Sequence, residues 1–188
     1  MTRLITAYTA LAARLNAATP WLLPSLARLV FAGVLAGYYL NSGLSKFGSG
    51  ITGLVRPDAG AYVTIFPKAM EAVNYDETQF GLFHWAVTLA GTWAEVILPV
   101  LIVIGLLTRL AAFGMIGFVF VQSVVDVTGH GLGSADIGRW FDATSGALLL
   151  DQRAFWVLCL AILVLRGAGP LSLDRLLQAR HPAAAQPA

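Results

Sequence analysis

The stretch Phe80–Val127, FGLFHWAVTLAGTWAEVILPVLIVIGLLTRLAAFGMIGFVFVQSVVDV, contains two long apolar runs with almost nothing between them. The first run covers about 80–106 and the second about 108–127. Because a helix of about 20 apolar residues crosses a bilayer, each run predicts a transmembrane helix. The link at 107–109 is so short that the two helices are expected to form an antiparallel hairpin.

Two further apolar runs flank this hairpin, at about 24–45 and about 147–165. Each is long enough to cross a bilayer. Within the first of them, Gly33 and Gly37 form a pair of small residues four apart, which suits close contact with another helix. The sequence therefore predicts an all-α fold, a four-helix transmembrane bundle, in a single membrane domain over 1–188.

The segments between and around the spans are also informative. Residues 1–19 place large apolar side chains at helical spacing, which predicts an amphipathic helix lying at the membrane interface. A long loop, rich in Gly and Pro, covers 46–79, and 61–66 within it is expected to be a short strand or a half-inserted piece. A glycine-rich acidic loop covers 128–146, and a short amphipathic helix is expected at about 171–178.

The composition supports a membrane protein and excludes several other classes. The chain of 188 residues is 57% hydrophobic and 12% charged, and its mean hydropathy is +0.74. A soluble domain is about 25% charged. The net charge of +2 and the absence of a Lys/Arg run argue against a nucleic-acid partner. A lone cysteine, Cys159, excludes an internal disulfide and Cys-rich zinc or iron–sulfur sites, and the sequence has no haem or nucleotide motif.

The basic residues predict the orientation of the bundle. Arginines cluster at the N-terminal side, at the tight turn and at the C-terminal side, all of which meet on one face when the spans are four: Arg3, Arg14, Arg28, Arg109, Arg166, Arg175 and Arg180. The two loops on the opposite face contain more acids than bases. Because cytoplasmic loops carry the excess of Lys and Arg, we expect a multi-pass protein of the cytoplasmic (inner) membrane, N-in and C-in.

The second span carries polar residues on one face. His84 and Glu95 lie roughly 20° apart around a helix, and Thr88 falls between them on the same side. A charge at bilayer depth needs a partner or a function. The simplest arrangement pairs Glu95 with Arg28 or with Arg109. This pair is either a structural ion pair that fixes helix packing or part of a proton path.

A second polar group is expected nearer the outer surface. A quinone site needs an apolar slot with a few polar donors, and Lys46, His84, Tyr39 and Thr88 are the candidates for such a ligand pocket. The alternative for His84, which is followed by Trp85, is a place in the aromatic belt at the membrane surface.

The third span adds polar residues at its outer end, Gln122, Asp126 and His130. The spacing of Asp126 and His130 is compatible with metal ligands, but two residues before a glycine-rich loop are a weak signal. We interpret them as an interfacial Asp and a loop His, and we expect no metal site.

Several short motifs, taken in order, resemble the DoxX family of small four-helix membrane proteins. They are Arg28 with the glycine-containing helix that follows it, Gly43–Phe47 (GLSKF), Glu95, Gly105–Ala112 (GLLTRLAA) and Gly167–Asp174 (GAGPLSLD). Together they extend over roughly residues 25–176. The long 46–79 loop and the acidic 128–146 loop depart from the family pattern, and both enlarge the outer face.

The resemblance implies a bundle in the cytoplasmic membrane and a link to redox chemistry, since some relatives are described as subunits of thiosulfate:quinone oxidoreductase or as quinol-oxidase-associated. The first hypothesis is therefore a membrane subunit of a quinone-linked respiratory or sulfur/thiol oxidoreductase, with quinone as cofactor. The alternative is a non-enzymatic membrane anchor or assembly partner, whose outer loops hold other proteins. Either role implies contact with membrane lipid and with other subunits or further copies of the chain.

Overall fold

The computed structural model describes residues 2–180, and every regular element in that range is helical. In chain order these are α1 (Thr2–Val30), the π-helical η1 (Phe31–Ala36), α2 (Gly37–Ser45), the 3-10 turn η2 (Ile51–Leu54), α3 (Ala59–Ile65), α4 (Pro67–Ala72), the 3-10 turn η3 (Glu77–Gln79), α5 (Leu82–Ile104), α6 (Thr108–Thr128), α7 (Ser134–Ile137), the π-helical η4 (Leu148–Gln152), α8 (Arg153–Arg166) and α9 (Leu173–Arg180). Four segments are long and apolar enough to cross a membrane: Thr2–Ser45, Leu82–Ile104, Thr108–Thr128 and Leu148–Arg166. The predicted all-α, four-span fold is confirmed.

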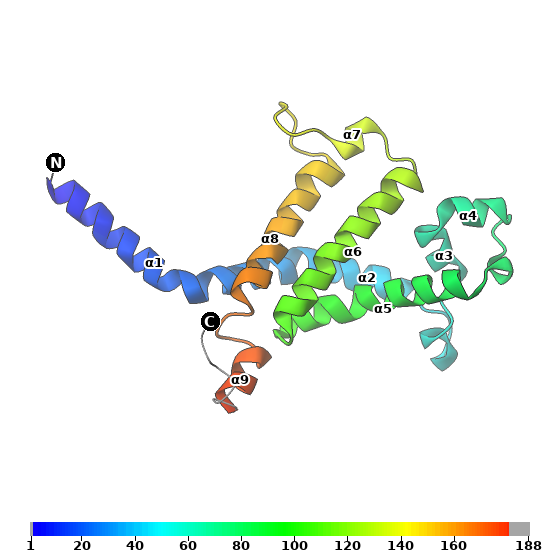
Figure 1. Ribbon diagram of the computed structural model, residues 1–188, viewed down its shortest axis with the longest axis horizontal. Coiled ribbons are helices and arrows are strands. Elements are labelled where there is room, and N and C mark those ends of the chain that lie inside the picture. Colours follow the sequence, from blue (N-terminus) through cyan, green and yellow to red (C-terminus); the bar gives the residue numbers. More distant parts are fainter. Residues whose placement is uncertain (1, 181–188) are drawn as a thin grey trace.

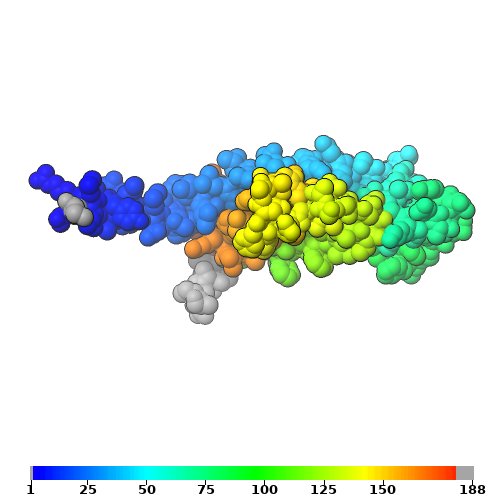
Figure 2. Space-filling model, turned by 90° about the horizontal axis from the view of Figure 1, so that it is seen from above, coloured from blue at the N-terminus to red at the C-terminus, as the bar shows by residue number. Residues whose placement is uncertain are grey.

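The first span differs from the expectation of two separate helices. α1, η1 and α2 form one continuous helix of 44 residues, Thr2–Ser45, although Pro20 and Pro24 lie inside it. At 1.5 Å per residue this helix is about 66 Å long, about twice the thickness of the hydrocarbon layer. Its N-terminal part projects from the rest of the molecule in both overall views (Figure 1, Figure 2). The interfacial position of residues 1–19 stays a prediction.

The four spans pack against one another with consecutive spans running in opposite directions, and the tight turn connects α5 to α6. α5 packs against both α2 and α6, and α6 packs most extensively against α8, which also contacts α1 (Figure 1). The turn between α5 and α6 uses left-handed backbone at Gly105 (φ 71°) and Leu107 (φ 49°). A Cβ at Gly105 would lie 2.5 Å from Cβ of Ser172, so only glycine fits there.

The C-terminal segment closes this turn. The carboxylate of Asp174 accepts hydrogen bonds from the backbone N–H of Leu107 (2.7 Å) and of Thr108 (3.0 Å). The first N–H groups of a helix have no partner inside the helix. Asp174 therefore caps α6 from outside the hairpin, and α9 confirms the short helix predicted at the end of the chain.

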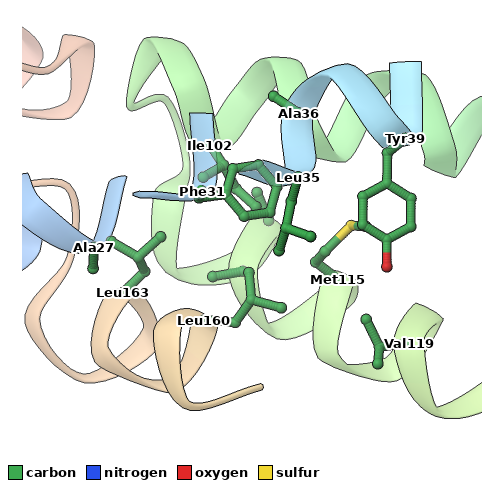
Figure 3. Packing of buried hydrophobic residues seen from close by; sticks show 12 residues of the cluster. Ala27, Phe31, Leu35, Ala36, Tyr39, Ile102, Met115, Val119, Leu160 and Leu163 are labelled. Carbon is green, nitrogen blue, oxygen red and sulfur yellow. The ribbon is translucent and has the colours of Figure 1, made fainter. Parts of the chain in front are cut away.

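The apolar core lies where the long helix crosses α5, α6 and α8. Phe31, Leu35 and Tyr39 from the long helix point toward Met115, Leu160 and other side chains of the neighbouring spans (Figure 3). The full buried cluster is Ala27, Phe31, Leu35, Ala36, Tyr39, Ile102, Ala111, Ala112, Met115, Val119, Leu160 and Leu163. Many other apolar side chains of the spans remain exposed, as expected for surfaces that face lipid.

The long loop 46–79 folds into a compact cap of short helices over one end of the bundle. Residues 61–66 are not a strand: Ala59–Ile65 is helix α3, and the Asp58 carboxylate caps its start by accepting from Gly60 N–H at 2.8 Å. The strand alternative is therefore wrong, because the Asp58 cap starts a helix just before the run. Trp85 and Trp93 of α5 donate indole hydrogen bonds to the carbonyls of Val55 and Leu54, which fasten the cap to the bundle.

Candidate functional site

A buried ion pair joins the first two spans. Lys46 Nζ lies 2.6 Å from Glu95 Oε2, and the two side chains are 6% and 9% exposed. Lys46 also donates to the hydroxyl of Ser42 at 2.6 Å. Since an unpaired charge at this depth would be costly, each group satisfies the other. The structure thus brings together two of the predicted polar residues, but not in the predicted combination.

The predicted pairing of Glu95 with Arg28 or Arg109 is wrong, and the register of the antiparallel helices gives the reason. Gly43 lies against Glu95, so α2 meets α5 at its middle, whereas Arg28 lies against Gly105 at the end of α5. Glu95 and Gly105 are about 15 Å apart along the helix axis. Arg28 cannot reach across that distance, while the flexible side chain of Lys46 ends beside Glu95.

Both arginines instead serve the backbone at the other end of the bundle. Arg28 donates to the carbonyls of Ala168 and Leu171, each at 2.6 Å. Arg109 donates to the carbonyl of Val164 at 3.2 Å. Val164 lies in the last turn of α8, and Ala168 and Leu171 lie in the non-helical segment after it. Carbonyls in such places lack a partner inside a helix, and guanidinium groups are suitable donors for them.

A second ion pair, which sequence reasoning missed, joins the last two spans. Arg153 Nη2 lies 2.5 Å from Asp126 Oδ2, and Arg153 Nη1 donates to the Ser123 hydroxyl at 2.7 Å. The Arg153 guanidinium also lies over the Trp156 ring, 5.8 Å from its centroid. Arg153 lies near the start of the predicted span 147–165, and Asp126 lies at the C-terminal end of the predicted span 108–127. That complementary placement was the available signal.

Tyrosines of the first span extend this second polar group. Gln122 accepts from the Tyr39 hydroxyl at 3.3 Å, and its amide lies 3.1 Å from the Tyr38 hydroxyl. The rings of both tyrosines contact Trp156, with centroids 5.8 Å from Tyr38 and 6.3 Å from Tyr39. Tyr39 and Gln122, predicted separately, therefore belong to one network with the Arg153–Asp126 pair.

The predicted ligand pocket of Lys46, His84, Tyr39 and Thr88 does not form as one site. His84 stacks on Phe80 with ring centroids 4.3 Å apart, near the start of α5. It lies about 16 Å along α5 from Glu95 and its partner Lys46, and Tyr39 belongs to the other network. Thr88 is fully buried, and its hydroxyl has no hydrogen-bond partner within residues 2–180.

The two residues with metal-ligand spacing have separate partners. Asp126 pairs with Arg153, while His130 Nε2 lies 3.0 Å from the carbonyl oxygen of Thr64 in α3. This second contact joins the loop after α6 to the cap. Within residues 2–180, no group of three or more His, Cys, Asp or Glu side chains is arranged to hold a metal ion.

An apolar groove lies between the long helix and α8, next to the second network. It has a volume of about 270 Å³ and is lined by residues of both π-helical turns: Val34 and Leu35 of η1, and Gln152 of η4. Phe155, Trp156 and Cys159 of α8 and Val30 complete the lining. π-helical turns inside helices occur frequently at functional sites. Trp156 connects the groove to the tyrosines and to Arg153.

Comparison with known proteins assigns the family. The DoxX family model matches residues 23–131, which covers more than half of the chain and includes Arg28, Lys46, Glu95 and Asp126. No curated protein and no solved structure is significantly similar to the chain. With its four apolar spans and this match, the chain is a membrane protein that belongs to the DoxX family.

Proposed function

We propose that this DoxX protein is the membrane subunit of a quinone-linked respiratory or sulfur/thiol oxidoreductase system. The observation that carries the proposal is the groove between η1 and η4, an apolar slot open at the surface of the bundle and adjacent to a buried polar network. Quinone, when bound, accepts two electrons and two protons. The electrons come from a partner subunit or a substrate at the outer face.

The groove has the chemistry that a quinone ring requires. Its volume of about 270 Å³ is slightly below the usual range for small-molecule pockets, so it suits the ring while the apolar tail lies in lipid. Among its lining residues, Gln152 and Trp156 carry N–H donors. Gln152 uses its amide nitrogen in a long bond of 3.3 Å to the Gly146 carbonyl, which a stronger acceptor can replace.

The proposal places the protein in the cytoplasmic membrane with both termini of the chain on the cytoplasmic side. The arginine distribution supports this orientation, because Arg28, Arg109 and Arg166 lie at one end of the four spans. The cap formed by 46–79 then faces outward, where a partner subunit that supplies electrons would meet it.

The test fills the groove without disturbing the core. Val34 lines the groove and is 62% exposed, so Val34→Trp places an indole in the slot. Val100→Trp is the matched control, since Val100 of α5 is 40% exposed and does not line the groove. We expect native quinone in the purified protein to fall by about tenfold in Val34→Trp, equivalent to about 1.4 kcal/mol, and to be unchanged in the control. Quinone content that is unchanged in Val34→Trp would reject the proposal.

A second candidate function, a non-enzymatic anchor for other proteins, is favoured by the outer loops. Ile51 is 88% exposed and Trp140 is 59% exposed, and Phe141 is fully exposed at a loop tip. Exposed apolar side chains at loop tips are suitable contacts for a partner. Under this alternative, Ile51→Asp with Phe141→Asp abolishes recovery of a partner by pull-down, while Ser145→Asp in the same loop does not. Intact recovery in the double variant would contradict it.

A further inference from the structure

A pocket rich in arginine lies at the end of the bundle where the predicted cytoplasmic ends of the spans meet. Its volume is about 530 Å³. Three arginines line it from three different elements: Arg109 at the start of α6, Arg166 at the end of α8 and Arg175 in α9. We call this the arginine pocket. It is separate from the groove of the proposed function, with which it shares no lining residue.

The charge in the arginine pocket is not balanced by the residues that line it. Asp174 is the one acidic residue in the lining, and both of its oxygens accept backbone hydrogen bonds at the start of α6. No ion pair within residues 2–180 involves Arg109, Arg166 or Arg175. Three positive charges around one cavity, against a single engaged carboxylate, create a positive potential that attracts an anion.

The arginines also have free hydrogen-bonding capacity. The Arg166 and Arg175 side chains donate no hydrogen bond within residues 2–180, and Arg109 uses one N–H, to Val164. Each guanidinium has five N–H donors in a planar fork that matches the oxygens of a phosphate group. Thr108, which also lines the pocket, is fully buried with no partner for its hydroxyl within the described range.

The position of the arginine pocket at the ends of the membrane spans indicates that a bound phosphate group would belong to a lipid. Arg166 ends one membrane span and Thr108 begins another, so the pocket lies at the level of the lipid headgroups. Its lining includes Trp21, 53% exposed, and Leu110, 70% exposed. An aromatic residue at this level is typical of the membrane interface. A ligand with a phosphate at one end and acyl chains at the other matches both parts of the pocket.

We propose that the arginine pocket binds the phosphate group of an anionic phospholipid. The arginines hold the phosphate oxygens by charge-assisted hydrogen bonds, and the acyl chains lie along the exposed apolar surface beside Trp21 and Leu110. The bound lipid would then connect α6, α8 and α9, which each contribute one arginine.

The experiment uses the whole 188-residue chain in detergent micelles that contain phosphatidylglycerol, contain phosphatidylcholine, or lack phospholipid and receive inorganic phosphate instead. Bound lipid per protein is measured by native mass spectrometry, together with the shift in melting temperature. The variant is Arg166→Gln, because the Arg166 side chain makes no hydrogen bond within residues 2–180 and the fold should survive its loss. Arg180→Gln is the matched control, since Arg180 is an exposed arginine of α9 outside the pocket lining. Arg175→Gln provides a second variant inside the pocket.

We expect phosphatidylglycerol to bind and stabilise the protein, and phosphatidylcholine to do so weakly. Arg166→Gln and Arg175→Gln each weaken phosphatidylglycerol binding by about tenfold, while Arg180→Gln does not. Inorganic phosphate that binds as tightly as the lipid would keep the phosphate site but overturn its assignment to lipid. An equal loss in Arg180→Gln, or no preference for phosphatidylglycerol, would overturn the site itself, because diffuse surface charge would then explain the binding.

Discussion

Two ion pairs within residues 2–180 each join neighbouring spans, but they differ in burial and in the groups around them. Lys46–Glu95 joins the long helix to α5 where Gly43 brings the two backbones close, and both side chains are less than a tenth exposed. Arg153–Asp126 joins α8 to α6, but Asp126 is 20% exposed and the pair extends into hydroxyls and aromatic rings. The Lys46–Glu95 pair is enclosed, and Ser42 is the other partner of its ammonium group. Arg153, in contrast, also contacts the Ser123 hydroxyl and the Trp156 ring. The cost of losing one charge therefore depends on which groups remain around the other.

The largest expected effect comes from breaking the enclosed pair. Glu95→Ala leaves the Lys46 ammonium buried with Ser42 as its remaining partner, and loss of one member of a buried pair costs about 3–5 kcal/mol. We expect the free energy of unfolding in detergent to fall by that amount, measured by denaturant titration. The double variant Lys46→Met with Glu95→Met should recover most of the loss, because an apolar pair is tolerated. Failure of the double variant to recover would show that the charges do more than satisfy each other.

The next prediction concerns the close approach of α2 and α5 at Gly43, which keeps the Lys46–Glu95 pair buried. A Cβ at Gly43 would lie 2.7 Å from Val96 Cγ2 and 2.9 Å from Glu95 Cβ. Gly43→Ala should therefore destabilise the protein by about 1–3 kcal/mol. Gly33→Ala is the matched control, since nothing lies within 4 Å of a Cβ there, and it should be neutral or slightly stabilising in the same unfolding measurement. Equal losses in both variants would contradict the close contact.

Breaking the Arg153–Asp126 pair is expected to cost less than breaking the Lys46–Glu95 pair. Asp126→Asn leaves Arg153 with the Ser123 hydroxyl and the Trp156 ring. Because these contacts remain and Asp126 is partly exposed, we expect a loss of about 1–3 kcal/mol, below that of Glu95→Ala. The two variants are compared by denaturant titration under one set of conditions. A loss in Asp126→Asn that equals or exceeds that of Glu95→Ala would reverse the comparison.

The smallest effect concerns a carboxylate outside the spans that has neutral partners only. Asp76 accepts from the Thr78 hydroxyl at 2.6 Å and from the Gln79 amide at 3.1 Å, and these hydrogen bonds, Thr78 first, lower the pKa of Asp76 below its usual 3.8. A lowered folded-state pKa contributes stability above the unfolded-state value, which is lost as the pH falls through the folded-state value.

We therefore expect the segment 76–79 to loosen below a pH of about 4, which amide hydrogen exchange around Thr78 would detect. Asp76→Asn should lower the protection of the Thr78 amide at neutral pH, measured as its exchange rate relative to an unstructured peptide at the same pH, and this protection should depend little on pH in this range. Identical exchange in the two proteins at neutral pH would contradict the role of the Asp76 carboxylate.

The fold was predictable from the sequence, and the contacts between the helices were not. Hydropathy located all four spans because length and apolarity alone decide whether a helix crosses a bilayer. The partner of Glu95 depended on the register between α2 and α5, which follows from the close approach at Gly43. Gly33 and Gly37, the pair of small residues expected to allow close helix contact, have nothing within 4 Å of a Cβ at either position. A pattern shows that close packing is possible, whereas the neighbouring surface decides where it occurs.

For the candidate site, too, the sequence located polar residues but not the contacts between them. The sequence predicted a charged partner for Glu95, a ligand pocket with Lys46 and Tyr39, and polar residues Gln122 and Asp126 at the outer face, whereas in the structure these five residues lie in two polar groups between the helices. It could not assign the partners, since residues distant in the sequence supply them. The groove could not be predicted either, because its lining comes from two distant segments of the chain, and the π-helical turns in them, FAGVLA and LLLDQ, have sequences that resemble ordinary helix.

The cap that Asp174 places on α6 has a consequence for the order of events during synthesis. The α5–α6 hairpin leaves the ribosome long before residue 174 does, so the N–H groups of Leu107 and Thr108 must first be satisfied by water or by the insertion machinery. Only when the last span has entered the membrane does the carboxylate arrive to replace them. The hydrogen bonds that close this turn thus form last. A chain that stops before Asp174 would contain all four spans, but the N–H groups of Leu107 and Thr108 between the middle two would lack their carboxylate acceptor.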